Sequence, residues 1–313
     1  MSDFTASELC QNHRAPSVNR LSRSETVIGC GWRKSMRRRR LCAVVIPLAL
    51  VACAAAREQP LIDRAEWVVH RDLLPHSQDA RKRVELFWTR PAGDGPYPVL
   101  LLIHGHQDHL RNGGEAFVRT GRLGVVARWG YVAAALSQPG YGKSDGPQDY
   151  CGPFTQDAAI VAVDFLRRQP FVDPKRVALY GYSRGAIVAS MVATKDPRLA
   201  AVVLGAGAYD FFSWYPTPLP AIDANIRLET GASAEAFRAR SAIYHVDKIR
   251  APVLVLHGAQ DERIPVRQAE LLAEQLKASG VAVTLRIFPG ARHGIPLDEP
   301  YREIYLFLEQ AFR

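Results

Sequence analysis

Three residues whose side chains can together perform nucleophilic catalysis occur along the chain in the order Ser183, Asp261 and His293. A serine hydroxyl is a weak nucleophile until a neighbouring imidazole accepts its proton. A carboxylate on the other ring nitrogen fixes the tautomer and stabilises the imidazolium. We therefore expect Ser183 to be the nucleophile, His293 the general base and later the general acid, and Asp261 the residue that orients the imidazole. This set predicts hydrolysis of a carboxylic ester or amide through an acyl-enzyme.

The residues around the serine support this interpretation. Residues 181–185 read Gly-Tyr-Ser-Arg-Gly and lie between a β-branched, apolar run at 176–180 and a helix-like stretch at 186–195. A serine on so tight a strand-to-helix turn is a nucleophile elbow, whose flanking glycines relieve crowding. Since the pentapeptide also occurs by chance, a glycine-rich turn without chemistry is the plain alternative.

The other polar side chains follow predicted strands, at the point where each strand ends. A His-Gly-His run at 104–106 follows the apolar run 98–103, Asp261 comes after 253–256, and His293 comes after 281–288. Parallel sheets bind ligands at the carboxyl ends of their strands, so these residues should meet at one edge. The backbone N–H groups of His106 and Arg184 are the candidate oxyanion hole. We expect the Arg184 side chain to lie at the rim of the site.

Rival assignments exist for the acid and the base. Glu262 could be the acid, with Asp261 a turn residue, although Asp261 is favoured. His245 and His257 precede Asp261 in the sequence, so they do not fit the order of the set. The alternative for His293 is a surface histidine in a glycine-rich loop.

Alternation of strands and helices predicts the fold class, an α/β protein with a doubly wound, mostly parallel sheet. The expected strands are residues 67–70, 84–88, 98–103, 131–136, 176–180, 200–204, 253–256 and 281–288. The expected helices are residues 116–129, 155–168, 186–195, 269–279 and 301–312, with a further helix-like stretch at 226–242. The length of 53–313 suits one domain.

Residues 205–251 interrupt the sheet as an insertion that could cover the site as a lid. Aromatic residues at 209–215 either line an apolar acyl or leaving-group pocket or pack on the core and on each other. Arginines at 227, 238 and 240 either form a basic rim or lie on a solvated face. The sequence leaves both questions open.

The chain resembles the catalytic domain of the prolyl oligopeptidase family and, more loosely, the dienelactone hydrolases. The resemblance covers most of residues 84–313 and rests on residues 98–105, 140–142, 176–185, 244–261 and 288–294. It implies the α/β-hydrolase fold, in which the order Ser, Asp, His is the expected one. One departure is Ala186, where many members have a second glycine.

A second departure concerns the β-propeller that gates substrates in large members of the family. Only about 44 residues lie between Cys53 and Pro98, too few for two blades. This favours a carboxylesterase acting on small esters or amides, without metal or organic cofactor. A prolyl-oligopeptidase-like peptidase acting on small peptides is the alternative.

A zinc-dependent hydrolase is a further, less favoured alternative. Residues 104–109 read His-Gly-His-Gln-Asp-His and resemble the H-x-H-x-D-H motif of metallo-β-lactamase-fold hydrolases. Such imidazole and carboxylate groups could bind a pair of zinc ions. That fold needs more ligands downstream, and the motif leaves Ser183, Asp261 and His293 unexplained. A binding module that has lost catalysis is the other alternative, which labelling by a fluorophosphonate would exclude.

The N-terminal residues have the composition of a targeting segment. Four arginines at 37–40 precede an apolar stretch at 41–50 that is too short to span a bilayer, and Leu-Val-Ala-Cys at 50–53 resembles a bacterial lipobox. We expect a signal peptide at 36–52, a lipid on Cys53 and a membrane-anchored, exported protein. Ordinary cleavage to a secreted or periplasmic protein is the alternative, and a cytosolic protein is a weaker one. Residues 1–35 are expected to be a non-native or disordered extension.

Charge and cysteine content exclude two further classes. Nine of the 40 basic and three of the 31 acidic residues lie in residues 1–52, so the rest of the chain has a net charge of only +3. This gives no reason to expect nucleic-acid binding. Cys151 is the one cysteine after Cys53, so no disulfide framework is expected. The number of subunits is not set by the sequence.

Overall fold

The structure is a computed structural model that describes residues 67–107, 111–296 and 298–313. The sequence predictions for residues 1–35 and 36–52 and for Cys53 lie outside these ranges and stay predictions. Within the described part of the chain, no helix has both the length and the apolar character needed to cross a membrane.

An eight-stranded sheet forms the centre of the described domain. Its spatial order is β1-β2-β4-β3-β5-β6-β7-β8. The β1–β2 and β2–β4 pairs are antiparallel, and all later pairs are parallel. The strands are β1 His70–Pro75, β2 Arg83–Thr89, β3 Tyr97–Ile103, β4 Val132–Leu136, β5 Val172–Tyr182, β6 Ala201–Gly205, β7 Val253–Gly258 and β8 Val283–Phe288. This is the doubly wound sheet that the alternating pattern predicts.

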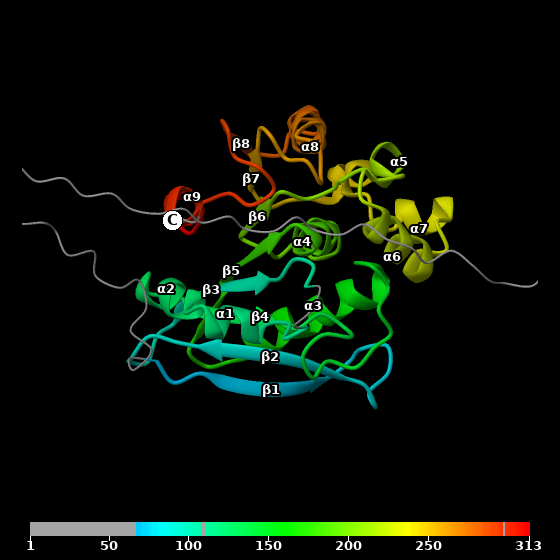
Figure 1. Cartoon of the computed structure of the whole chain (residues 1–313). Helices are drawn as coiled ribbons and strands as arrows, with labels where there is room; N and C mark the ends of the chain where they lie inside the picture. Colours follow the sequence, from blue (N-terminus) through cyan, green and yellow to red (C-terminus); the bar gives the residue numbers. More distant parts are fainter. Residues whose placement is uncertain (1–66, 108–110, 297) are drawn as a thin grey trace, which may run out of the picture. The chain divides into compact units, whose positions relative to one another are not determined.

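Helices cover both faces of the sheet, which explains why its central strands are continuous apolar runs. Helices α3, α4 and α8 pack on one face, and α1, α2 and α9 pack on the other (Figure 1). Their bounds are α1 Glu115–Arg119, α2 Arg122–Arg128, α3 Pro153–Arg167, α4 Arg184–Lys195, α8 Arg267–Ala278 and α9 Asp298–Ala311. In β3, every residue from Val99 to Ile103 is fully buried.

Two N-terminal elements differ from the sequence prediction. The first strand begins at His70 rather than Trp67, and Val68 is 74% exposed, so its apolar side chain does not indicate a buried strand. The single helix expected at 116–129 is two helices, because Gly121 adopts a φ of 72° that ends α1 and begins α2. A left-handed glycine is a common helix terminator.

The insertion at 205–251 holds three short helices and two 3₁₀ turns. They are α5 Phe211–Trp214, α6 Pro220–Thr230, α7 Ala234–Arg238, η1 Ala242–Tyr244 and η2 Val246–Lys248. Gly231, at a φ of 67°, splits the helix-like stretch expected at 226–242. Phe211 and Trp214 are buried and pack against each other and against the core beside α4, so these aromatic rings are core rather than pocket lining.

Candidate active site

Ser183 lies on the sharp turn between β5 and α4, as the motif predicts. Its backbone has φ 53° and ψ −121°, a region that side-chain-bearing residues rarely occupy. A Cβ at Gly181 would collide with the backbone of Gly185, and a Cβ at Gly185 would collide with the backbone of Ile103. The two glycines are therefore required by close backbone approach, and the turn presents the serine hydroxyl at the carboxyl end of the sheet.

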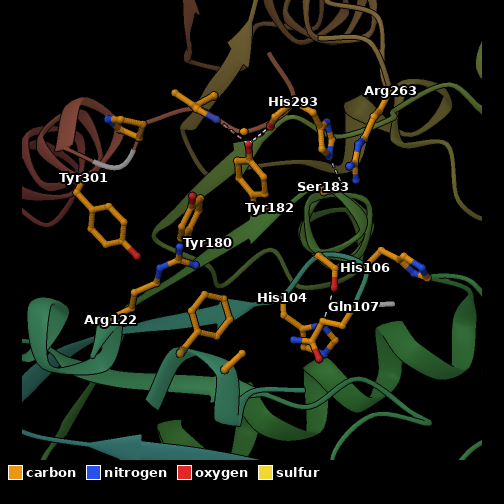
Figure 2. A pocket seen from close by; sticks show the side chains of 16 residues that line it. His104, His106, Gln107, Arg122, Tyr180, Tyr182, Ser183, Arg263, His293 and Tyr301 are labelled. Carbon is orange, nitrogen blue, oxygen red and sulfur yellow. Dashed lines mark hydrogen bonds between the residues drawn. The ribbon is translucent and has the colours of Figure 1, made fainter. Parts of the chain in front are cut away.

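The structure brings the three candidate side chains into one hydrogen-bonded chain. The Oγ atom of Ser183 lies 3.0 Å from Nε2 of His293 (Figure 2). Nδ1 of His293 lies 2.8 Å from Oδ2 of Asp261. The serine follows β5, the aspartate β7 and the histidine β8, so three parallel strands deliver them to one edge. The arrangement suits transfer of the serine proton to Nε2 while the carboxylate accepts the Nδ1 proton.

Asp261 is held by more donors than the sequence indicates. Its side chain is fully buried, and Nε2 of His257 lies 3.2 Å from Oδ2. The backbone N–H groups of Arg263 and Ile264 both donate to Oδ1 at 2.9 Å. Burial raises the pKa of this carboxyl, but the hydrogen bonds from His257, His293 and Ile264 outweigh burial and hold the pKa well below its usual range. Asp261 is thus an anion at neutral pH.

The rival acid, Glu262, has a different environment. Its side chain pairs with Arg292 at 3.3 Å, and both are solvent-exposed. It reaches the backbone N–H of His293 at 3.4 Å but not the imidazole ring. The geometry therefore favours Asp261 over Glu262 as the partner of His293.

The turn after β3 approaches the serine closely. A Cβ on Gly105 would lie 3.2 Å from Cβ of Ser183 and 3.8 Å from its Oγ atom. His106 follows directly, and Arg184 is the first residue of the twelve-residue helix α4. Backbone N–H groups at a helix start are suited to stabilising an oxyanion. Both candidate oxyanion residues are therefore adjacent to the serine.

His104 is fully committed to hydrogen bonds. Its Nδ1 donates to the carbonyl of Gly105 at 2.7 Å, and its Nε2 accepts from the backbone N–H of Gln138 at 3.1 Å. With both ring nitrogens used, His104 is not available as the metal ligand that the H-x-H-x-D-H resemblance requires. Among the described residues, no group of three His, Cys, Asp or Glu side chains could hold a metal ion; Asp108 and His109 lie outside them.

The burial of His104 predicts a pH-dependent stability. Burial lowers the pKa of His104 to about 4, and the hydrogen bond to Gly105 only partly opposes that shift. Between pH ~6.5 and 4 the unfolded chain binds a proton that the folded chain does not, so stability falls as pH falls, by about 3 kcal/mol in total. We expect urea denaturation of His104→Gln to show a flatter loss over this range; parallel wild-type and variant curves would contradict this.

The side chain of Arg184 is not at the rim of the site, so that expectation is wrong. It is only 3% exposed and forms a 2.8 Å ion pair with Glu229, which belongs to α6 of the insertion. Its guanidinium stacks over the Tyr150 ring, with Cζ 4.5 Å from the ring centroid. The thiol of Cys151 donates to the Arg184 carbonyl at 3.3 Å. The residue after the nucleophile thus links the elbow to the insertion.

Tyr182, the residue before the serine, connects the elbow to the histidine loop. Its hydroxyl donates to the carbonyl of His293 and accepts from the backbone N–H of Ile295 at 3.2 Å (Figure 2). Sequence reasoning missed this role because any residue can occupy the second position of the motif. The tyrosine holds the loop that carries His293 against the strand that carries Ser183.

A cavity of about 400 Å³ opens beside Ser183. None of its described lining residues comes from the insertion at 205–251. Its walls are formed by the turn after β3, α1, the start of α2, the end of β5, the segment after β7, the loop between β8 and α9 and the start of α9. They include Phe117, Arg122, Tyr180, Tyr182, His293 and Tyr301 (Figure 2). A concave, largely aromatic site next to a serine–histidine pair is suited to bind part of a substrate.

The fold and the serine–histidine–aspartate geometry together define an α/β hydrolase. The chain belongs to the prolyl oligopeptidase family, whose sequence profile matches residues 123–313, and it is therefore a serine hydrolase. The uncharacterized peptidase YuxL of Bacillus subtilis (strain 168) is 28% identical over 218 residues, covering 66% of this chain and 33% of YuxL. The uncharacterized peptidase YtmA of the same organism is 28% identical over 224 residues, covering 70% of this chain and 85% of YtmA. The chain thus spans a third of one relative and most of the other.

Solved structures agree on the fold. The acylaminoacyl peptidase of Pyrococcus horikoshii superposes with a TM-score of 0.65 at 18% identity, covering 78% of this chain and 42% of that one. A Klebsiella pneumoniae structure assigned as a dienelactone hydrolase gives a TM-score of 0.58 at 16% identity, covering 78% and 99% of the two chains. These identities establish a shared α/β-hydrolase fold and nothing finer.

Proposed function

We propose that this protein is a serine peptidase that cleaves short peptides. The observation that carries the proposal is the hydrogen-bonded chain from Ser183 through His293 to Asp261, at the edge of an aromatic cavity. Membership of the prolyl oligopeptidase family and the peptidase names of the relatives favour this alternative over the carboxylesterase that the sequence analysis preferred. A carboxylesterase remains the second candidate.

The proposed reaction has two halves. Oγ of Ser183 attacks the scissile carbonyl carbon while Nε2 of His293 takes the hydroxyl proton, and the N–H groups of His106 and Arg184 bind the oxyanion. The C–N bond then breaks, and His293 gives its proton to the departing amine. Water next attacks the acyl-serine with His293 as base, which releases the acid and restores the serine. Asp261 stays ionised throughout and stabilises the imidazolium.

A substrate panel tests this proposal. We expect the purified protein to hydrolyse aminoacyl anilides and short peptides as well as p-nitrophenyl esters, with rates unchanged by EDTA. Turnover of the esters alone would return the assignment to a carboxylesterase. Strong loss in EDTA that zinc restores would overturn the serine mechanism. Steady-state kcat/KM values for each substrate class are the measurement.

A further inference from the structure

Arg122, the first residue of α2, lies in the wall of the cavity and has no carboxylate partner among the residues that the structure describes. Its side chain is half-buried, and its Nε atom is shielded from solvent without a hydrogen-bond partner among the described residues. Its guanidinium forms no ion pair with any carboxylate that the structure describes, and its Cζ lies 5.8 Å from the centroid of the Phe117 ring. Charges that are shielded from solvent are normally paired in proteins. An anionic group of a ligand could therefore be the partner of this guanidinium.

Two tyrosine rings flank this guanidinium. In Figure 2 it lies between Tyr180 and Tyr301, with the Tyr301 hydroxyl directed toward it. Burial raises the pKa of Tyr301 to about 12, and the nearby charge of Arg122 opposes that rise. The same charge opposes the rise that burial causes in Tyr180. Both hydroxyls therefore stay protonated, and the Tyr301 hydroxyl is able to donate a hydrogen bond beside the cation.

The charged side chains among the described lining residues of the cavity, His293 aside, are all basic. None of its described lining residues is acidic, whereas Arg122 and Arg263 are both basic. Arg263 lies beside His293 at the cavity, and its exposed side chain forms no ion pair within the described ranges (Figure 2). Other arginines close to the site do have carboxylate partners, as Arg184 has Glu229 and Arg292 has Glu262. Such a cavity favours an anionic group on the ligand.

The position of the cavity indicates which part of the substrate enters it. One wall is Tyr182 together with residues 293–295, the loop that carries the general acid and that Tyr182 holds through two hydrogen bonds. The departing amine receives its proton from Nε2 of His293, so the leaving group departs on the side of this loop. Another wall is the turn at residues 104–107, which carries the proposed oxyanion N–H of His106, whereas Arg184 is buried and does not line the cavity. The cavity therefore accepts the leaving group.

We propose that Arg122 binds a carboxylate of the leaving group, so that preferred substrates are short peptides whose free C-terminal carboxylate enters this cavity. The inference rests on the proposed peptidase function and assigns the substrate class of the same site. A guanidinium is suited to bidentate binding of a carboxylate, and the Tyr301 hydroxyl adds a donor. The volume of about 400 Å³ lies near the lower end of the roughly 300–1,000 Å³ range of ligand pockets, which suits a leaving group of one or two residues.

A matched pair of substrates tests the proposal. Acetyl-Ala-Ala-Phe with a free carboxylate and its C-terminal amide differ in one charge, and kcat/KM is measured for both. We expect the wild type to prefer the acid by about 10–100-fold, mainly through KM, and Arg122→Gln to lose that preference while still cleaving the amide. Arg119→Gln is the control, since Arg119 is 62% exposed and does not line the cavity.

The possible outcomes separate this inference from the peptidase proposal. Equal cleavage of acid and amide by the wild type, or a preference that persists in Arg122→Gln, would overturn the role of Arg122 and leave a peptidase. If neither peptide is cleaved, the peptidase proposal fails, and protection of Ser183 from a fluorophosphonate probe decides the binding question. Stronger protection by the acid that requires Arg122 supports the carboxylate site, and equal protection by acid and amide rejects it.

Discussion

Ser183→Ala is expected to lower kcat by a factor on the order of 10⁶ without unfolding the protein. The reason is geometric, because the hydroxyl 3.0 Å from Nε2 of His293 is removed, and no covalent acyl-enzyme can form. Residual turnover of roughly 10³–10⁴ over water is expected from the oxyanion groups and from binding. Initial rates at equal protein concentration give both quantities, with fluorophosphonate titration counting the active sites of the wild type. Unchanged turnover in this variant would falsify the serine mechanism.

The same position offers a stability control that does not depend on activity. Alanine keeps a Cβ at φ 53°, so it keeps the backbone strain of the turn, whereas glycine removes the strain. We expect Ser183→Gly to be more stable than Ser183→Ala by about 1 kcal/mol in urea denaturation, although glycine loses more chain entropy on folding. A less stable glycine variant would mean that the turn is not strained. Both variants should be equally inactive.

The positions of the three catalytic candidates could be predicted from the sequence, because a parallel sheet places the carboxyl ends of its strands at one edge. Strand β3 is buried on both faces, so its sequence is a continuous apolar run that can be recognised without a structure. Once the strands are placed, each polar residue that follows a strand must lie at the same edge. This is why Ser183, Asp261 and His293 could be paired over separations of up to 110 residues.

Contacts that depend on irregular segments could not be predicted in this way. The partner of Arg184 is Glu229, 45 residues away in an insertion whose helices carry no periodic signal strong enough to place them. The hydrogen bonds of Tyr182 to the histidine loop likewise depend on where a loop passes, not on a pattern. The break between α1 and α2 could have been predicted more easily, because a glycine, Gly121, stands inside the expected helix and glycine often ends helices.

The buried pair between Arg184 and Glu229 is expected to carry the largest effect on stability. Their side chains are 3% and 8% exposed, so Glu229→Gln would leave an uncompensated charge in the interior. Removing one partner of such a pair typically costs about 3–5 kcal/mol. The backbone N–H of Tyr150 also donates to Glu229 at 2.6 Å, so the loop before α3 should loosen as well. Urea denaturation at pH 7 measures the loss.

An exposed pair in the same chain supplies the comparison. Arg267 and Glu274 on α8 lie 2.8 Å apart but are 54% and 56% exposed. Solvent screens such a pair, and Glu274→Gln should cost less than about 1 kcal/mol. If Glu229→Gln costs no more than Glu274→Gln, the interior around Arg184 is wet or mobile, and the pair does not hold the insertion to the elbow.

Replacing both Arg184 and Glu229 separates the contribution of the pair to protein stability from its contribution to positioning the elbow at Ser183. Arg184→Met with Glu229→Leu removes both charges and fills a similar volume, and buried pairs replaced in this way often regain the lost stability. Arg184 also supplies a proposed oxyanion N–H, and its side chain anchors the first turn of α4 to α6. We therefore expect the double variant to regain stability but to keep a kcat below that of the wild type, with KM little changed. Recovery of kcat together with stability would show that the pair only supports the fold, because an apolar contact would then orient the elbow equally well.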